Sequence, residues 1–568
     1  MKNTDLFSFN GINGATGGYL TPEMTAADVS KIVRDEKFNK EHLQDLIDRY
    51  NKPDHLGPIA GIDPTNLAQA GWGIIFAFDD RDKVAARKES LKPLLDLRKE
   101  QAGEYYREYT GPDAYRSGES KNDFLGRHGR APGPANPETI PYYLLIVADP
   151  ETIPYRFQYQ IDVQYAVGRI YFDTLEEYAN YAQSVVQAEK GEYTRSAKAT
   201  FFGVQNPADK ATELSATELV QPLADWMAED QPDWSVQTLL KDEAMKANLT
   251  ELFNNPDGPA LLFTASHGMG FPNGDIRQLP HQGALLCQDL PGMLKWRGKP
   301  VPEEHYFSAD DVGTGAKLGG MINFHFACYG AGTPKQDEFA HKIERTDIAP
   351  HAFMARLPQR LLSHPKGGAL AVISHVERAW GCSFMWKSSG RQLDIFKDLI
   401  KYLTAGYPVG YAVEEFNERY AELSTDLTNE LNELQFGKIP NDMKLSRMWT
   451  SNNDARGYAI IGDPAVRLPT SATGMKMPKP PIRVQSGDVP LKPGDDWLDH
   501  TVTVTVSSQN GEIRKEKTWS GSMIIPSGAD EAKKDEHLAS LHRKVAAEAK
   551  KGWEEDRSVI STRQEEKE

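Results

Sequence analysis

Short apolar runs alternate with longer segments of helical, amphipathic spacing through most of the chain. Apolar runs bounded by Gly, Pro or Asp are typical of buried strands, and the charged segments between them are typical of helices. This alternation predicts an α/β fold with a mainly parallel sheet and helices on both faces; one continuous sheet or two would accommodate residues 70–470. The predicted strands are 73–78, 142–148, 199–204, 260–267, 320–328, 368–374 and 457–464. The predicted helices are 26–50, 81–109, 174–190, 213–228, 243–254, 391–404 and 409–436.

From residue 471 onward the pattern changes. Pro and Lys residues at 475–481 predict an extended linker. Period-two alternation at 501–506, followed by a turn signal at 509–512, predicts a β-hairpin that continues to residue 519. A charged segment rich in Ala and Lys predicts a helix over 530–556. We therefore expect a small C-terminal extension made of a β-hairpin and a helix.

The composition narrows the location and the partners of the protein. Of the 568 residues, 39% are hydrophobic and 26% charged, and no apolar run approaches the roughly 20 residues that span a bilayer. A formal net charge of −16 argues against a protein that coats nucleic acid. The N-terminus has no basic segment followed by an apolar one. We expect a cytoplasmic protein with no direct contact to nucleic acid or membrane.

Two predicted strands end in side chains that can perform chemistry. His267 follows one strand and Cys328 follows the next, and both precede glycines. Ligands of open α/β sheets bind at the carboxyl ends of strands. An imidazole near Cys328 would make its thiol a useful nucleophile, while the backbone amides of Gly268 and Cys328 could bind a developing oxyanion. The pattern predicts acyl transfer through a thioester; a hydrogen-bonded histidine and a small buried hydrophobe are the structural alternative.

Other patterns around the cysteines indicate less. The three cysteines, Cys287, Cys328 and Cys382, include no CxxC pair and fit a reducing compartment. His325 and Cys328 have a zinc-like separation, but they alternate across a strand and no second ligand pair appears, so we expect no metal and no other cofactor. The sequence around Cys382 is faintly similar to the papain cysteine region without its context, so we interpret Cys382 as structural.

The two blocks together resemble the signature of the clan CD cysteine peptidases, which include caspases, legumain, separase, clostripain and gingipains. The blocks are an apolar strand followed by Ser266-His267-Gly268 and an apolar strand followed by Ala327-Cys328. Segments 143–154, 165–170 and 461–464 are similar to the gingipain branch. The resemblance covers about residues 140–470. It implies a caspase-hemoglobinase-like fold with a gingipain-like two-part arrangement.

The resemblance also implies roles for single residues. Cys328 would be the nucleophile, and His267 would protonate the leaving amine. Asp162 is placed like the acidic pocket residue of gingipains, where a carboxylate pairs with Arg or Lys of the substrate; a solvated loop carboxylate is the alternative. Glu377 and Trp380 would line the same pocket, although Trp380 could equally belong to the core. The candidates for orienting His267 come from strand ends and loops: Asp149, Glu151 and Asp275.

These inferences divide the chain into three parts. We expect an N-terminal α/β subdomain that contributes to the substrate pocket (1–195), a caspase-like catalytic domain (196–470), and a linker, hairpin and charged tail with a regulatory role (471–568). The expected partners are a protein substrate, with a pore-forming or other effector protein in a bacterial defence programme as one option, and an activating partner. Self-cleavage in the polar segment 438–456 is the other route to activation. The alternative to a peptidase is a caspase-fold binding or scaffold protein that acts through its C-terminal extension.

Overall fold

The structure is a computed structural model of the whole chain, and it falls into two compact units. One unit comprises residues 1–57 and 71–475, and the other comprises residues 58–70 and 476–568. The described residues are 6–7, 11–20, 24–35, 57–59, 61–296, 298–339, 346–386, 390–435, 439–470, 482–486, 497–506 and 518–524.

One ten-stranded sheet runs through the larger unit, so the predicted sheet is continuous. All seven predicted strands are confirmed within a few residues, and the mainly parallel α/β class is confirmed with them. The sheet has the order β5-β4-β6-β7-β20-β17-β14-β10-β8-β9. Its strands are β4 (Trp72–Ile75), β5 (Tyr106–Tyr109), β6 (Tyr143–Val147), β7 (Ala166–Ile170), β8 (Lys198–Gly203), β9 (Ser235–Leu240), β10 (Leu261–Ala265), β14 (Ile322–Phe326), β17 (Ala371–His375) and β20 (Tyr458–Gly462).

The sheet consists of two parallel blocks that run in opposite directions. Strands β5, β4, β6, β7 and β20 are parallel to one another, as are β17, β14, β10, β8 and β9. The blocks meet at β17 and β20, which pair antiparallel with Ala371 opposite Gly462 and His375 opposite Tyr458. The carboxyl ends of one block therefore share a sheet edge with the amino ends of the other block. The division expected at residue 195 stays a prediction.

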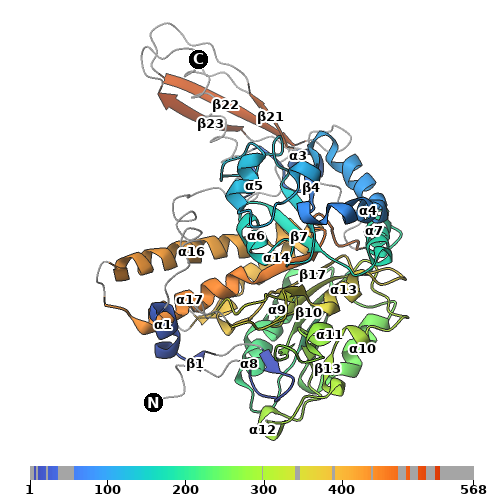
Figure 1. Cartoon of the computed structure of the whole chain (residues 1–568). Coiled ribbons are helices and arrows are strands. Elements are labelled where there is room, and N and C mark those ends of the chain that lie inside the picture. The colour runs from blue at the N-terminus through green and yellow to red at the C-terminus, as the bar shows by residue number, and fades with distance from the viewer. Residues whose placement is uncertain are drawn as a thin grey trace. The chain divides into compact units, whose positions relative to one another are not determined.

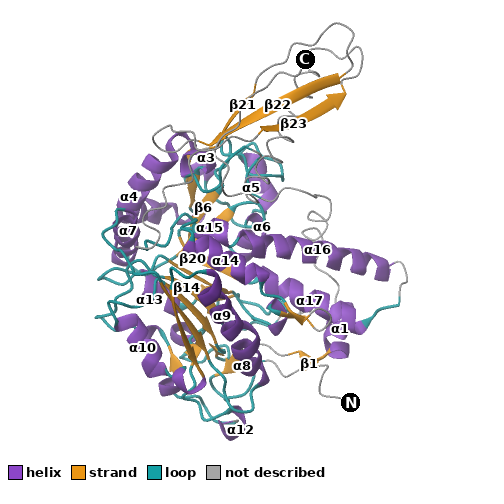
Figure 2. Ribbon diagram, turned by 180° about the vertical axis from the view of Figure 1, so that it is seen from behind, coloured by secondary structure: helices purple, strands orange, loops and turns teal. Residues whose placement is uncertain are grey.

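Helices cover both faces of the second block, as Figures 1 and 2 show for α10 and α13 on one face and α9 and α14 on the other. The predicted helix 81–109 is shorter than expected: it ends at Ala102, because Gly103 has a φ of 55°, and residues 106–109 form the edge strand β5. A π-helical segment, Ser215–Val220, joins α8 to α9. The helices are α4 (Arg81–Ala102), α5 (Lys121–Arg127), α6 (Tyr155–Ile161), α7 (Leu175–Glu189), α8 (Lys210–Leu214), α9 (Gln221–Asp230), α10 (Lys246–Asn254), α11 (Gln278–His281), α12 (Met293–Trp296), α13 (Arg356–Leu362), α14 (Asp394–Thr404) and α15 (Val409–Ala412).

A second, four-stranded sheet lies next to the carboxyl end of β10 in the chain. It has the order β13-β12-β11-β2, and its strands are β2 (Gly11–Asn13), β11 (Gly268–Gly270), β12 (Leu285–Leu286) and β13 (Tyr306–Phe307). The N-terminal strand β2 pairs parallel with β11, directly after His267. The two-stranded pairs are β1 (Leu6–Phe7) with β3 (Met24–Thr25), β15 (Gly332–Thr333) with β16 (Phe353–Met354), and β18 (Met385–Trp386) with β19 (Gly390–Arg391).

Three helices pack together beside the sheet: α1 (Ala26–Asp35), α16 (Glu414–Gln435) and α17 (Asp442–Arg456) (Figure 1). The predicted helix 26–50 is confirmed as far as Asp35; the rest lies outside the described residues. The polar segment 438–456, expected to be a cleavable loop, is helical from Asp442 onward. Trp449 and Arg456 are buried there, so that expectation is wrong for the helical part.

The smaller unit contains α3 (Leu67–Ala70) and an antiparallel three-stranded sheet. Its strands are β21 (Ile482–Ser486), β22 (Trp497–Val506) and β23 (Thr518–Ile524). β22 contains the predicted strand 501–506, and Val502 pairs with Trp519 of β23. The predicted turn 509–512 and helix 530–556 lie outside the described residues.

Candidate active site

His267 and Cys328 follow neighbouring parallel strands. The register of β10 and β14 pairs Ala265 with Phe326, so each of the two residues lies two positions beyond the same pair. The Ser266 N–H continues this pairing by donating to the Phe326 carbonyl at 3.2 Å. Because carboxyl ends of adjacent parallel strands meet at one edge, the fold places a histidine and a cysteine side by side.

Gly268 brings the two strand ends into direct backbone contact. A Cβ atom at Gly268 would lie 1.8 Å from the Cys328 carbonyl oxygen and 2.8 Å from the Cys328 nitrogen. No other residue type fits there without moving one of the strands. Gly268 and Cys328, expected to supply the oxyanion donors, therefore adjoin each other at the strand ends.

The carboxylate that holds His267 is Asp209, which follows β8. Asp209 Oδ2 accepts a hydrogen bond from His267 Nε2 at 2.6 Å, and both side chains are fully buried. The Tyr19 hydroxyl donates to Asp209 Oδ1 at 2.6 Å and the Thr212 hydroxyl to Oδ2 at 2.9 Å. Burial raises the pKa of Asp209, but the interactions with His267, Tyr19 and Thr212 outweigh it and hold that pKa below its ordinary value. Asp209 is thus an ionised acceptor.

An ionised Asp209 fixes which nitrogen of His267 carries the proton. Since a carboxylate only accepts, the hydrogen on the neutral ring belongs to Nε2. His267 Nδ1 is buried and has no hydrogen-bond partner among the residues that the structure describes. The lone pair on Nδ1 can therefore accept a proton from a thiol. The protonated nitrogen can later donate that proton to a leaving group.

Cys328 lies in a closed, strained turn. Its side chain is fully buried, and its Sγ accepts a hydrogen bond from the Ala379 N–H at 3.2 Å. Burial raises the pKa of the Cys328 thiol to about 12, even though the Ala379 N–H acts in the opposite direction. The following residue, Tyr329, has a φ of 60°, which is costly for a residue with a side chain and typical of functional turns. Burial therefore favours the protonated thiol near neutral pH.

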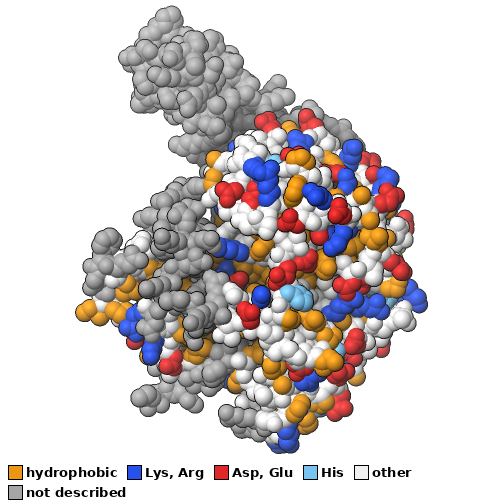
Figure 3. Space-filling view, viewed as in Figure 1, with side chains coloured by type: hydrophobic (Ala, Val, Ile, Leu, Met, Phe, Trp, Pro, Cys, Tyr) orange, Lys and Arg blue, Asp and Glu red, His pale blue; other side chains and the backbone are white. Residues whose placement is uncertain are grey.

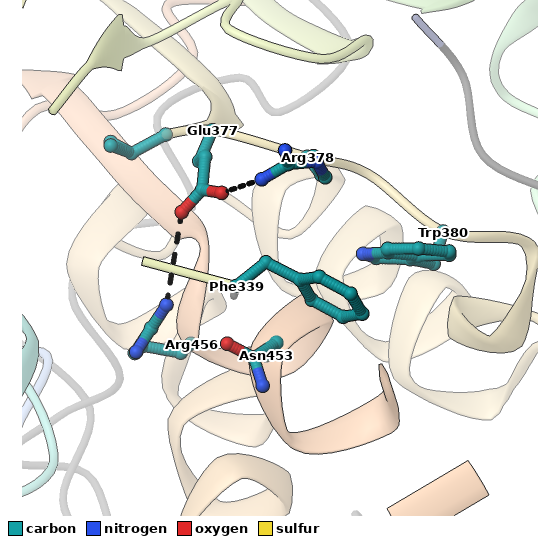
Figure 4. Close-up of a pocket in the computed structure, with 7 residues that line it drawn as sticks. Phe339, Glu377, Arg378, Trp380, Asn453 and Arg456 are labelled. Carbon is teal, nitrogen blue, oxygen red and sulfur yellow. Dashed lines mark hydrogen bonds and ion pairs between the residues drawn. The ribbon is translucent and has the colours of Figure 1, made fainter. Parts of the chain in front are cut away.

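Glu377 contacts the turn that follows the cysteine, and it shares a small cavity with Trp380; that the two line a substrate pocket stays a prediction. The Glu377 carbonyl accepts a hydrogen bond from the Tyr329 N–H at 2.6 Å. The side chains of Glu377 and Trp380 line a cavity of about 10 Å³, room for roughly one water (Figure 4). The Trp380 ring packs on Phe339 with centroids 4.9 Å apart. The other residues that line the cavity are Val376, Arg378, Asn453 and Arg456.

The Glu377 carboxylate already has cationic partners. It accepts from the Arg378 guanidinium and lies 3.9 Å from Arg456 Nη2, and both contacts are drawn in Figure 4. Arg378 also binds Asp337 with both terminal nitrogens, at 2.9 and 2.8 Å. Burial raises the pKa of Glu377 to about 8, against the lowering effect of Arg378. The protein's own arginines therefore surround the acid in this state.

Asp162 lies on the same edge of the sheet as Cys328 but does not line the Glu377 cavity. It precedes β7, whose amino end shares an edge with the carboxyl end of β17. Its carboxylate accepts the Val167 N–H at 3.1 Å, and burial raises its pKa well above the usual range. Asp162 is thus buried, with hydrogen bonds to the Val167 N–H and to the Asn417 side chain.

The three expected orienting carboxylates have other partners. Asp149 accepts from the backbone N–H groups of Glu151 and Thr152, Glu151 accepts from the Ala352 N–H, and Asp275 accepts from Arg277. Asp149 and Glu151 follow β6, which ends at the opposite edge of the sheet from His267. β6 is also five strands from β10, roughly 24 Å at the usual strand spacing. The residue that contacts His267 is instead Asp209, because β8 is the immediate neighbour of β10.

Sequence reasoning missed Asp209, Tyr19 and the Ala379 N–H. The sequence contains a signal for Asp209: it caps α8 in a polar turn after the strand 199–204, and His267 likewise comes at the carboxyl end of a strand. The missing information was that this strand adjoins the histidine strand. No local pattern connects Tyr19, near the N-terminus, to this site, since Tyr19 and Asp209 are 190 positions apart.

The surface of the larger unit carries both acidic and basic side chains (Figure 3). In Figure 3 acidic and basic side chains alternate over the visible face, without a large patch of one sign. None of the helices in the described part of the chain combines the length and the apolar character that a membrane crossing needs.

Comparisons with known proteins give low overall similarity. No protein-family model matches the chain, and no curated protein matches it in sequence. A solved structure described as "Structure of Protease" is similar at a TM-score of 0.41 and 12% identity, over 79% of this chain and 88% of the other. The "Complex of Porphyromonas gingivalis RgpB pro- and mature domains" is similar at a TM-score of 0.38 and 13% identity, over 82% and 95%. With both TM-scores below 0.5, neither similarity bears on function, so a function has to be inferred from the residues of the site.

Proposed function

We propose that the protein is a cysteine endopeptidase in which Cys328 is the nucleophile and His267 the acid-base residue, held by Asp209. The observation that carries the proposal is the His267–Asp209 pair on the strand next to a buried cysteine at a strained turn. Carboxylate, imidazole and thiol are the three groups of nucleophilic catalysis at a cysteine. The fold we propose is caspase-hemoglobinase-like, with the two oppositely directed blocks as its two parts.

The chemistry follows from these groups. In an opened site, His267 Nδ1 takes the thiol proton, and the Cys328 thiolate attacks the peptide carbonyl to form a tetrahedral oxyanion. The backbone N–H groups of Gly268 and Cys328 are the proposed donors to that oxyanion. Collapse breaks the C–N bond, and His267 gives its proton to the leaving amine. Water then hydrolyses the thioester, with His267 as the base, and regenerates the thiol.

For the residue before the cleaved bond we keep a preference for Arg or Lys as a prediction. Its two candidate acids are Glu377, beside the nucleophile, and Asp162, on the same edge of the sheet. Both carboxylates are occupied in the closed state, so selection of a substrate cation requires that one of them exchanges its partner. Glu377 already binds guanidinium groups, which supports the idea that its surroundings accommodate this cation.

A panel of fluorogenic Arg, Lys, Asp and neutral peptides tests the function. We expect thiol-dependent cleavage that disappears in Cys328→Ala. Asp162→Asn and Glu377→Gln, assayed in parallel, should show a selective loss for Arg and Lys peptides in one of the two variants. Equal cleavage of all peptides by both variants would refute an acidic pocket. Absence of any Cys328-dependent cleavage would favour a binding or scaffold protein.

A further inference from the structure

The N-terminal segment of residues 11–20 folds onto the candidate active site. It closes on itself, because the Asn13 N–H donates to the Gly18 carbonyl at 2.8 Å and the Leu20 N–H to the Gly11 carbonyl at 3.1 Å. Its strand β2 then pairs parallel with β11, Gly11 opposite Gly268. In Figure 1 this blue strand lies among green elements that come from the middle of the chain. A segment distant in sequence therefore completes the sheet that follows His267.

Gly11 lies directly against the nucleophile. A Cβ atom at Gly11 would be 3.1 Å from Cys328 Sγ and 3.3 Å from Cys328 Cβ. Cys328 has no exposed surface, with the Ala379 N–H as a further neighbour of its sulfur. A peptide carbonyl that is to be attacked must come within about 3–3.5 Å of Sγ. The backbone at Gly11 fills space next to the sulfur that such a peptide would need.

Tyr19 covers the other half of the pair. Its hydroxyl donates to Asp209, and its ring lies edge-on to the His267 ring with centroids 5.6 Å apart. Both residues of the candidate dyad thus contact the same ten-residue segment: Gly11 at the thiol and Tyr19 at the imidazole and its carboxylate. His267 is fully buried as well.

The segment is held by an apolar anchor and by main-chain bonds. Ile12 is fully buried in a cluster with Met269, Phe271 and Leu286. The Gly14 N–H donates to Gly270 at 2.6 Å, and the Gly14 carbonyl accepts from Val301 at 2.8 Å. These contacts favour the closed state, and Ile12 is the side chain whose loss should weaken it most.

We propose that residues 11–20 are an intramolecular cover that occupies the substrate approach to Cys328 and His267 and has to move away before a peptide can react. The proposal deepens the peptidase function and rests on it for its meaning. Its physical content is independent of catalysis: the cover hides the thiol, and displacement of the cover exposes it. Activation by a partner would then be capture of this segment or of the groove it leaves.

Disulfide trapping tests the contact. In Gly11→Cys the new sulfur should bond to Cys328, because the Cβ separation of 3.3 Å is close to the disulfide range and only the flexible end of Leu20 must shift. Mild oxidation should give an intact mass about 2 Da below that of the reduced protein. Gly18→Cys is the matched control: among the described residues a Cβ there meets only Thr16 Oγ1, so it should not cross-link to Cys328. Free alkylation of both cysteines in Gly11→Cys after oxidation would overturn the proposal.

Thiol labelling tests displacement. Iodoacetamide should label Cys328 in the folded protein on the order of 100-fold more slowly than in guanidinium, and Ile12→Asp should accelerate labelling of Cys328 on the order of tenfold or more. Cys287, also fully buried, is the internal reporter of global unfolding and should stay unlabelled in both proteins. If Ile12→Asp unfolds the protein and labels Cys287 too, Tyr19→Phe replaces it, with a smaller acceleration expected. Fast labelling of Cys328 in the unchanged protein, or no acceleration in either folded variant, would contradict the cover.

The two proposals can fail separately. Selective exposure of Cys328 in Ile12→Asp without cleavage of any peptide would leave the cover standing and remove the peptidase function. Cysteine-dependent cleavage by a protein whose Cys328 is freely labelled would support the peptidase function and remove the cover.

Discussion

The two blocks of the central sheet are both parallel, and the candidate dyad lies at the carboxyl ends of the strands of one of them. In the block β17-β14-β10-β8, neighbouring strands end in Cys328, His267 and the turn of Asp209. In the block β4-β6-β7, the turn after β6 also carries acids, but Asp149 and Glu151 stabilise their own turn and the backbone of Ala352. The difference lies in strand order and direction rather than in local sequence: an acid after a strand serves His267 only if that strand adjoins β10 and runs the same way.

The largest difference between the two blocks is expected when Asp209 in one and Asp149 in the other are each replaced by asparagine. Asp209→Asn removes the carboxylate that fixes the His267 proton on Nε2, and we expect kcat/KM to fall on the order of 10³-fold. The same change at Asp149 should leave kcat/KM unchanged, because that carboxylate lies at the opposite edge. A shift of the pH–rate profile in Asp209→Asn, with an unchanged Tm, separates a positioning role from misfolding. A similar fall of kcat/KM in both variants would mean that the position of the acid in the sheet does not determine whether it serves His267.

The free energy of unfolding tests the close backbone approach of Gly268 to Cys328. Gly268→Ala puts a methyl group against the Cys328 carbonyl, so the free energy of unfolding should fall by about 1–3 kcal/mol. Gly315→Ala is the control, since a Cβ there meets no atom of the described residues within 4 Å. Urea unfolding measures both. An unchanged free energy of unfolding in Gly268→Ala would show that the strand ends are not in backbone contact.

A smaller effect concerns the pH dependence of stability at Glu377. Its pKa is about 8 in the folded protein against an ordinary value of 4.5, so between these values the folded state keeps a proton that the unfolded state has lost. The free energy of unfolding should therefore decrease as pH rises through this window, and Glu377→Gln should remove that part of the slope. Urea midpoints at pH 5, 6, 7 and 8 for the two proteins check it. Parallel pH curves would contradict a buried, proton-binding Glu377.

Much of the fold can be predicted from the sequence, because each buried strand is a short apolar run that punctuating residues delimit. His267 and Cys328 were identifiable for the same reason: a reactive side chain at a strand end is a local pattern. Their neighbours were not. The partner of His267 depends on which strand lies beside β10, and strand order is a property of the whole chain.

The N-terminal segment shows the same limit. Residues 11–20 form a glycine-rich stretch without a phosphate-binding motif, and nothing local connects them to Cys328. A Cβ at residue 11 would lie 3.1 Å from the sulfur of Cys328, which is more than 300 positions away in the chain. Contacts of this kind arise from tertiary packing rather than from periodicity.

Whether a substrate acylates Cys328 can be read directly by acid-quench mass spectrometry. The protein, with its cover weakened by Ile12→Asp, is mixed with an Arg or Lys peptide ester, quenched in acid and digested. We predict an acyl mass on the fragment that contains Cys328, absent in Cys328→Ala and formed much more slowly in His267→Ala. Turnover of the ester without an adduct on that fragment, at the same rate in Cys328→Ala, would contradict a nucleophilic role for Cys328.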